Sequence, residues 1–208
     1  MDRGMKQEKD TYSFDGDGNI DCISMGENGQ IMRLWEQPIM EASAEVICEK
    51  GGDILNIGHG MGLIDDAIQR QDIKSHTIIE VNTQVLQELK TKKYRNCTII
   101  EEDWWWAFRK GIIGKYDGIY IDTAQNDRTF HAFIDVARYF CKPGATISWF
   151  NSINGRMNHW GVWCDYRVLK FPKGVIPECP SPLNNYHPST THNYIPVFRP
   201  NNTWSPNE

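Results

Sequence analysis

The chain has 208 residues, enough for one domain or for one domain with an appendage. Its 22 basic and 27 acidic residues give a net charge of −5, so the overall charge offers no attraction to nucleic acid or to an anionic membrane surface. No apolar run approaches the roughly 20 residues that a membrane-spanning helix needs, and the first residues contain no apolar segment typical of a secretion signal. We therefore expect a cytoplasmic protein without nucleic-acid or membrane partners.

Residues 1–32 are polar and rich in glycine, with short apolar stretches on either side of an acidic, glycine-containing segment at 15–21. Turn-forming residues between apolar stretches predict a hairpin or a loose arm. The acidic segment has Ile20 where a calcium loop needs its central glycine, and Gly26 where it needs a glutamate. We therefore expect a turn here and not a calcium site.

Residues 33–151 alternate between helical and strand patterns. Strands are short and apolar, and most helices are preceded by a capping residue or followed by glycine or proline. Helices are predicted for 39–50, 63–71, 83–93 and 127–142, and strands for 53–58, 76–82, 97–100, 115–122 and 145–150. This alternation is typical of an α/β fold with a mainly parallel, twisted sheet covered by helices on both faces.

Residues 152–208 differ in composition, since eight of the ten prolines lie at position 172 or later. A strand or short helix is predicted for 161–171 and an edge strand for 194–198. Large aromatic side chains in a proline-rich segment suggest a lid over a site, while the composition equally suits a partly disordered extension. The aromatic residues in question are Trp160, Trp163, Tyr186 and Trp204.

Six cysteines are spread through the chain without a C-x-x-C pair, which favours free thiols over a disulfide framework. His187 and His192 are the nearest approach to a cluster of metal ligands, and their spacing does not form a zinc motif. We therefore expect no metal site.

A glycine-rich loop follows the first strand of the alternating region. Gly58, Gly60 and Gly62 stand between a predicted strand and a predicted helix, where glycine lets the backbone approach a ligand. A dinucleotide-binding loop needs its third glycine at the position that Leu63 occupies. The G-x-G-x-G form found here is typical of S-adenosylmethionine-dependent methyltransferases, whose ligand has no pyrophosphate.

An acidic residue stands at or just after the end of each of the next two predicted strands, where it could bind a nucleoside. Glu80 lies twenty residues after Gly60 at a strand end, where a carboxylate accepts hydrogen bonds from ribose hydroxyls. Asp103 and Trp104 follow the third strand, where a polar group can bind the adenine amino group and an aromatic ring can lie against the base. The order of these features along three consecutive strands predicts an S-adenosylmethionine site.

Five stretches of residues 33–151 and their immediate surroundings resemble the guanidinoacetate N-methyltransferase family and its relatives, the fungal- and bacterial-type arginine δ-N-methyltransferases. They are residues 32–42, 51–69, 76–82, 116–123 and 142–151. The W-E-x-P-x-M sequence at 35–40 and the Y-I-D-T sequence at 120–123 discriminate this family from other methyltransferases. The resemblance implies a Rossmann-like class I methyltransferase fold, an S-adenosylmethionine-binding domain at 33–151 and a diverged segment at 152–208.

The resemblance also implies roles for individual residues. Cofactor contacts are expected from Met32, Met40, Gly58, Gly60, Met61, Glu80, Asn82, Asp103, Trp104 and Asp122. Glu36 and Asp122 are expected to bind the guanidino group, with Thr123 beside them.

The chemistry of methyl transfer agrees with these roles. A guanidinium is planar, delocalised and protonated, so its nitrogens have no lone pair to spare. Two carboxylates can hold its fork bidentately and present one nitrogen to the methyl group, and one of them can accept the proton as the new bond forms. We expect Glu36 to bind the group, and Asp122 to bind it and act as the general base.

Three functional hypotheses follow. The first is N-methylation of a small guanidino compound, either guanidinoacetate-like or arginine-like. The second is methylation of an arginine in a protein, which an acidic chain with a proline-rich segment would suit. The third is a cofactor-binding module without catalysis. A nicotinamide oxidoreductase is less favoured because Leu63 departs from the dinucleotide pattern. The sequence permits a homodimer without specifying one.

Overall fold

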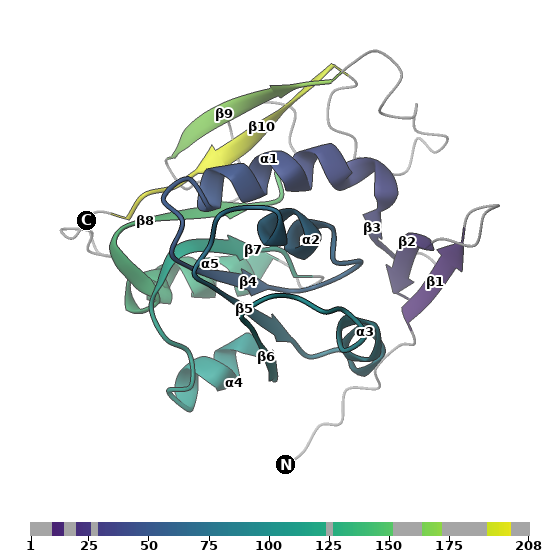
Figure 1. The fold of residues 1–208 in the computed structure, drawn as a ribbon, viewed down its shortest axis with the longest axis horizontal. Helices are drawn as coiled ribbons and strands as arrows, with labels where there is room; N and C mark the ends of the chain where they lie inside the picture. The colour runs from purple at the N-terminus through teal and green to yellow at the C-terminus, as the bar shows by residue number, and fades with distance from the viewer. Residues whose placement is uncertain are drawn as a thin grey trace.

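The computed structural model describes residues 10–14, 20–25, 29–123, 127–151, 164–171 and 191–200 (Figure 1). Its centre is a five-stranded sheet with the strand order β6-β5-β4-β7-β8, in which every neighbouring pair is parallel. The strands are β4 (Asp53–Ile57), β5 (Ser75–Glu80), β6 (Cys97–Glu101), β7 (Tyr116–Ile121) and β8 (Cys141–Trp149). The predicted α/β fold with a parallel sheet is confirmed.

Helices cover both faces of this sheet. They are α1 (Gln37–Ile47), α2 (Leu63–Gln69), α3 (Thr83–Leu89), α4 (Trp104–Arg109) and α5 (Asp127–Val136), with two 3₁₀ turns, η1 (Leu34–Glu36) and η2 (Ala137–Tyr139). No helix in the described ranges is long and apolar enough to cross a membrane.

The two faces of the sheet form separate apolar clusters because side chains alternate along each strand. Ile54 and Tyr120 pack with α1 and α2 on one face. Leu55, Ile119 and Ile121 point to the other face and pack with α4 and α5. Burial on both faces explains why these strands read as nearly continuous apolar runs in the sequence.

The last strand of the sheet differs from the prediction. The helix expected over 127–142 ends at Val136, and β8 begins at Cys141, so Pro143 and Gly144 lie inside a strand. Proline has no N–H to donate to a neighbouring strand, which is tolerated at an edge, and β8 is the edge strand of this sheet. The pairing of β7 with β8 is also irregular between Tyr116 and Gly118, which accommodates this segment.

A small antiparallel sheet precedes the α/β region. Its strands are β1 (Asp10–Phe14), β2 (Ile20–Met25) and β3 (Gly29–Arg33), in that order. The strand β3 continues directly into η1 and α1, so it delivers residues 32–36 to the sheet region.

A second antiparallel pair, β9 (Asp165–Lys170) and β10 (His192–Val197), lies over α1 (Figure 1). The predicted edge strand therefore pairs with β9, and it contacts the main sheet through one bridge between Phe198 and Ile147. The buried Ile195 and Val197 pack in the α1 cluster. The four aromatic residues on which the lid prediction rests lie outside the described residues.

The thiols of Cys48, Cys97 and Cys141 form no disulfide in the described part of the chain.

Candidate active site

The glycine loop connects β4 to α2 at the carboxyl edge of the sheet. Gly58, Gly60 and Gly62 all have positive φ angles, of 94°, 56° and 79°. A β-carbon on Gly58 would lie 2.0 Å from the carbonyl oxygen of Asp122, and one on Gly60 would lie 3.2 Å from the thioether of Met32. Only glycine allows both the backbone conformation and this close approach. The loop is therefore packed between the end of β7 and the end of β3.

Glu80 ends β5 and holds the glycine loop from the other side. Its Oε2 accepts a hydrogen bond from the backbone N–H of His59 at 2.8 Å. Its Oε1 accepts from the N–H groups of Val81 and Asn82 at 2.8 and 2.7 Å. Since a carboxylate has about four acceptor positions, one remains for a further donor.

A buried polar network below the loop was missed by the sequence reasoning. Asp65, in the first turn of α2, is fully buried and accepts hydrogen bonds from His59 Nδ1 at 2.6 Å and from Asn56 Nδ2 at 2.8 and 2.9 Å. His76 Nε2 lies 3.0 Å from the other carboxylate oxygen. Asn56 also donates to the carbonyl of Gly58 at 2.8 Å. The network therefore connects two positions of the glycine loop to a helix and two strands.

The charge of Asp65 is maintained by its partners. Burial disfavours the ionised carboxylate, but the two histidines beside it hold its pKa below the ordinary value. The available sequence signal was an acidic residue among the apolar residues of the helix predicted for 63–71, six residues after a histidine in the loop. Such a residue needs a buried partner, although the sequence does not say which one.

Asn82 and Asp103 occupy the expected strand ends and act as helix caps. Asn82 Oδ1 accepts from the N–H groups of residues 84 and 85 in α3 at 2.8 and 3.1 Å. Asp103 Oδ1 accepts from those of residues 105 and 106 in α4 at 2.9 and 3.3 Å. Trp104 is 5% exposed, and its ring lies edge-to-face against Phe133, 5.7 Å between centroids. Trp104 therefore packs in the apolar cluster between the sheet and α4–α5, and its predicted contact with the cofactor stays a prediction.

The three predicted methionines are buried. Met32 lies against Gly60, as the loop geometry requires, and Met61 lies within the loop itself. Met40 is fully buried, and its sulfur accepts a hydrogen bond from the hydroxyl of Tyr120 at 3.3 Å. Met40 therefore fixes α1 on the sheet, whereas Met32 lies at the loop.

Glu36 and Asp122 come from different elements. Glu36 ends η1 and immediately precedes α1, and its Oε1 accepts a hydrogen bond from the backbone N–H of Arg33 at 3.1 Å. Asp122 follows β7, and its N–H donates to the carbonyl of Ile57 at 3.0 Å. Thr123 comes next, with its methyl group 3.6 Å from the β-carbon position on Gly58. The loop, Asp122 and Thr123 are thus brought together at one edge of the sheet.

Burial raises the pKa of both carboxyl groups, and Asp122 also acts on Glu36. Glu36 is 3% exposed, and burial, followed by the nearby charge of Asp122, raises its pKa to about 8, although the N–H and charge of Arg33 act in the opposite direction. Burial raises the pKa of Asp122 to about 7. Within the described part of the chain, no lysine, arginine or histidine forms an ion pair with either group. No described ion pair therefore balances this acidic pair, and a bound cation would favour its ionised form.

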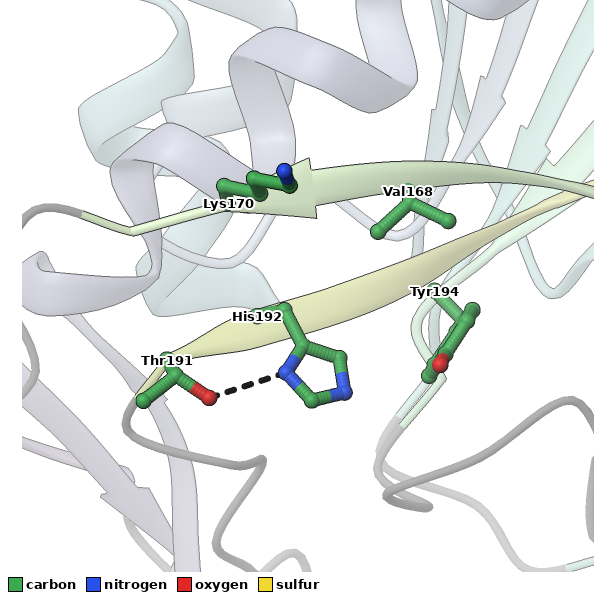
Figure 2. A pocket seen from close by; sticks show the side chains of 5 residues that line it. All are labelled: Val168, Lys170, Thr191, His192 and Tyr194. Atoms are coloured by element: carbon green, nitrogen blue, oxygen red, sulfur yellow. Dashed lines mark hydrogen bonds between the residues drawn. The ribbon is translucent and has the colours of Figure 1, made fainter.

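A separate shallow pocket lies on the outer face of the β9–β10 pair. Figure 2 shows the five side chains that line it: Val168, Lys170, Thr191, His192 and Tyr194. None of them is among the predicted site residues, and the pocket contains no carboxylate. It is therefore distinct from the acidic pair.

Comparison with known proteins gives a consistent result. The family model for guanidinoacetate N-methyltransferase matches residues 9–161, which contain the loop and both carboxylates. The chain is 31% identical to protein arginine N-methyltransferase 2 of Kluyveromyces lactis over 206 residues, covering 86% of this chain and 50% of that protein. It is 35% identical to the protein of the same name in Emericella nidulans over 118 residues, covering 53% of this chain and 28% of that protein. The chain thus spans half or less of the length of these relatives.

Solved structures share the fold at low sequence identity. An RNA methyltransferase of Salinibacter ruber, in complex with S-adenosyl-L-homocysteine, has a TM-score of 0.55 and 11% identity, covering 81% of this chain and 94% of that one. Spermidine synthase of Thermotoga maritima has a TM-score of 0.56 and 16% identity, covering 85% of this chain and 67% of that one. The architecture is therefore the Rossmann-like fold of S-adenosylmethionine-dependent methyltransferases.

Proposed function

Because this chain belongs to the guanidinoacetate N-methyltransferase family, we propose that it transfers the methyl group of S-adenosylmethionine to a guanidino nitrogen of a small molecule. The observation that carries the proposal is the acidic pair of Glu36 and Asp122, of which Asp122 packs against the glycine loop and neither forms an ion pair with a described lysine, arginine or histidine. A planar guanidinium supplies both the positive charge and the N–H donors that such a pair lacks.

The residues around the loop fit S-adenosylmethionine. Glu80 keeps one acceptor position, which suits a ribose hydroxyl, and Asp103 keeps its second carboxylate oxygen, which suits the adenine amino group. Met32 and Gly60, in contact with each other, lie where the methionine end would pass. When bound, this cofactor supplies an electrophilic methyl group on a sulfonium.

The acidic pair performs the remaining tasks. Glu36 and Asp122 bind the guanidinium through paired hydrogen bonds and orient one nitrogen toward the loop. In methyl transfer that nitrogen would gain the methyl carbon as the carbon–sulfur bond of the sulfonium breaks, with its electron pair left on sulfur, and the carboxylate of Asp122 would accept the proton that the nitrogen loses. Because burial places the pKa of Asp122 at about 7, this group can both accept the proton and release it to water near neutral pH.

A second acceptor, an arginine side chain in a protein, is favoured by a separate observation. The two curated relatives described above are both named protein arginine N-methyltransferase 2. The same pair of carboxylates would bind a peptidyl arginine through the same fork. Product analysis with an arginine-rich peptide separates this acceptor from a small molecule.

Substitution of the acidic pair tests the proposal. S-adenosylhomocysteine formation with a guanidino acceptor is measured for the wild type, Asp122→Asn and Glu36→Gln, with the exposed Asp72→Asn as the matched control. We expect Asp122→Asn to lower kcat by about 10²- to 10⁴-fold, since it preserves the shape and removes the base. Calorimetric binding of S-adenosylhomocysteine shows that the cofactor site remains intact. Unchanged turnover in Asp122→Asn would refute the proposed role.

A further inference from the structure

His59 is a fully buried side chain in the glycine loop to which the proposed function gives no role. Its ring Nδ1 lies 2.6 Å from Oδ2 of Asp65. The partners of Asp65 hold the pKa of this carboxyl below its ordinary value, and an ionised carboxylate only accepts hydrogen bonds. Nδ1 of His59 therefore carries a proton and donates it, which fixes the ring to the first turn of α2.

Gly62 makes room for this ring. A β-carbon on Gly62 would lie 2.8 Å from Cε1 and 3.0 Å from Nε2 of His59. The N–H of Gly62 also donates to the carbonyl of His59 at 2.8 Å, which closes a tight turn over residues 59–62. The third glycine of the loop therefore accommodates the imidazole of His59, and the backbone and the ring of this residue are both held in place.

The backbone of His59 holds one particular oxygen of Glu80. Oε1 of Glu80 accepts two hydrogen bonds, both from residues that follow it directly, Val81 and Asn82. Oε2 accepts one among the described residues, from the N–H of His59 at 2.8 Å. Each carboxylate oxygen has about two acceptor positions, so the unused position is on Oε2. The direction of that position is set by a residue of the loop and not by the neighbours of Glu80 in the chain.

We propose that His59 is a positioning residue for the ribose of S-adenosylmethionine. Asp65 fixes the ring of His59, and the backbone N–H of His59 orients Oε2 of Glu80 so that its unused acceptor position faces a ribose hydroxyl. An acceptor that is already oriented does not have to be ordered when the ligand binds, and this raises affinity. The proposal rests on the proposed contact between Glu80 and the ribose, and it does not depend on the identity of the methyl acceptor.

Calorimetric binding of two ligands tests this role. The ligands are S-adenosylhomocysteine and its 2′,3′-dideoxy analogue, which differ in the ribose hydroxyls. We expect the wild type to bind S-adenosylhomocysteine about 10- to 100-fold more tightly, the effect of hydrogen bonds to a charged group. His59→Leu removes the donor to Asp65 and should lower the affinity for S-adenosylhomocysteine by about 5- to 30-fold. The affinity for the dideoxy analogue should change by less than about 3-fold, because this ligand offers Glu80 no hydroxyl.

Matched variants separate positioning from general damage. His59→Asn places an amide N–H close to the position of Nδ1, so it should keep the affinity for S-adenosylhomocysteine within about 3-fold of the wild type. His131→Leu removes an exposed histidine of α5 and should change the binding of neither ligand. Circular dichroism shows whether each variant folds. If His59→Leu does not fold, His59→Gln, whose amide lies nearer the position of Nε2, replaces it with the same expectation.

A double-mutant comparison tests whether His59 acts through Glu80. Glu80→Gln removes the acceptor at Oε2, so adding His59→Leu to it should lower the affinity for S-adenosylhomocysteine by less than about 2-fold. An equal loss of affinity for both ligands in His59→Leu, or the full loss again in the Glu80→Gln background, would overturn the proposal. A wild type that binds neither ligand, or binds both equally, would also overturn it. These measurements contain no methyl acceptor, so the absence of methyl transfer to guanidines would refute the proposed function and leave the role of His59 to be decided by ligand binding.

Discussion

Binding of a guanidino compound should release protons from Glu36 and Asp122. In the free protein, burial raises their pKa values to about 8 and about 7. At pH 7, Glu36 is then roughly 90% protonated and Asp122 about half protonated. A bound guanidinium favours the ionised form of both groups, and it remains protonated itself. The complex should therefore release on the order of one proton per acceptor bound at pH 7.

The raised pKa values also determine how the number of released protons changes with pH. Release should approach two protons per acceptor near pH 5, because both groups start protonated, and should vanish near pH 9, because both start ionised. Affinity for the acceptor should accordingly rise with pH up to about 8 and then level off. Calorimetry in phosphate and in Tris, whose ionisation enthalpies differ, measures the number of protons directly.

Variants assign the released protons to the acidic pair. Glu36→Gln cannot release a proton, so we expect the release at pH 7 to fall to that of Asp122 alone. Asp72→Asn, at an exposed site, should leave it unchanged. Equal heats in both buffers at pH 7 would show that the two carboxyl groups are already ionised, and the account of the acidic pair would be wrong.

Three further predictions concern stability and cofactor binding. Raised pKa values mean that the folded state binds more protons than the unfolded state. The free energy of unfolding of the ligand-free wild type should therefore fall as the pH rises from about 4 to 8, by up to about 1.4 kcal/mol per pH unit for each group. Chemical denaturation should show a smaller slope for Glu36→Gln, and an equal slope in the variant contradicts this prediction. Asp65→Asn should lower the free energy of unfolding by about 3–5 kcal/mol, because the buried donors around this position would then face an amide in place of a carboxylate. Calorimetry should show Tm lowered by roughly 6–20 °C, whereas the Tm of Asp72→Asn should stay within about 2 °C of the wild type. Gly58→Ala should abolish measurable S-adenosylhomocysteine binding, since its β-carbon would collide with the carbonyl of Asp122; wild-type affinity would show that the loop adapts.

The strand and helix alternation could be read from the sequence because burial on both faces leaves a strong pattern. Residues 54–57 and 119–121 are almost continuously apolar, since both faces of β4 and β7 are covered. The boundary before β8 could not be read in the same way. Pro143 and Gly144 usually end a helix and precede a strand, and only the edge position of β8 permits them within one.

Site residues could be predicted from the sequence where a local sequence pattern determines their position in the fold. The positions of Gly58, Glu80 and Asp122 at the strand ends follow from the parallel sheet. The partners of Asp65 and the buried position of Trp104 depend on contacts between distant elements, which no local pattern records.

Acceptor-dependent formation of S-adenosylhomocysteine tests the central claim most directly. The wild type is incubated with S-adenosylmethionine and, separately, with guanidinoacetate, free arginine, other guanidino acids, ethylguanidine and an arginine-rich peptide. We expect turnover with one or more guanidino acids and a loss of about 10²-fold or more in Asp122→Asn. Confirmed cofactor binding with no turnover on any of these acceptors would contradict the claim that Glu36 and Asp122 form a guanidino-binding catalytic pair.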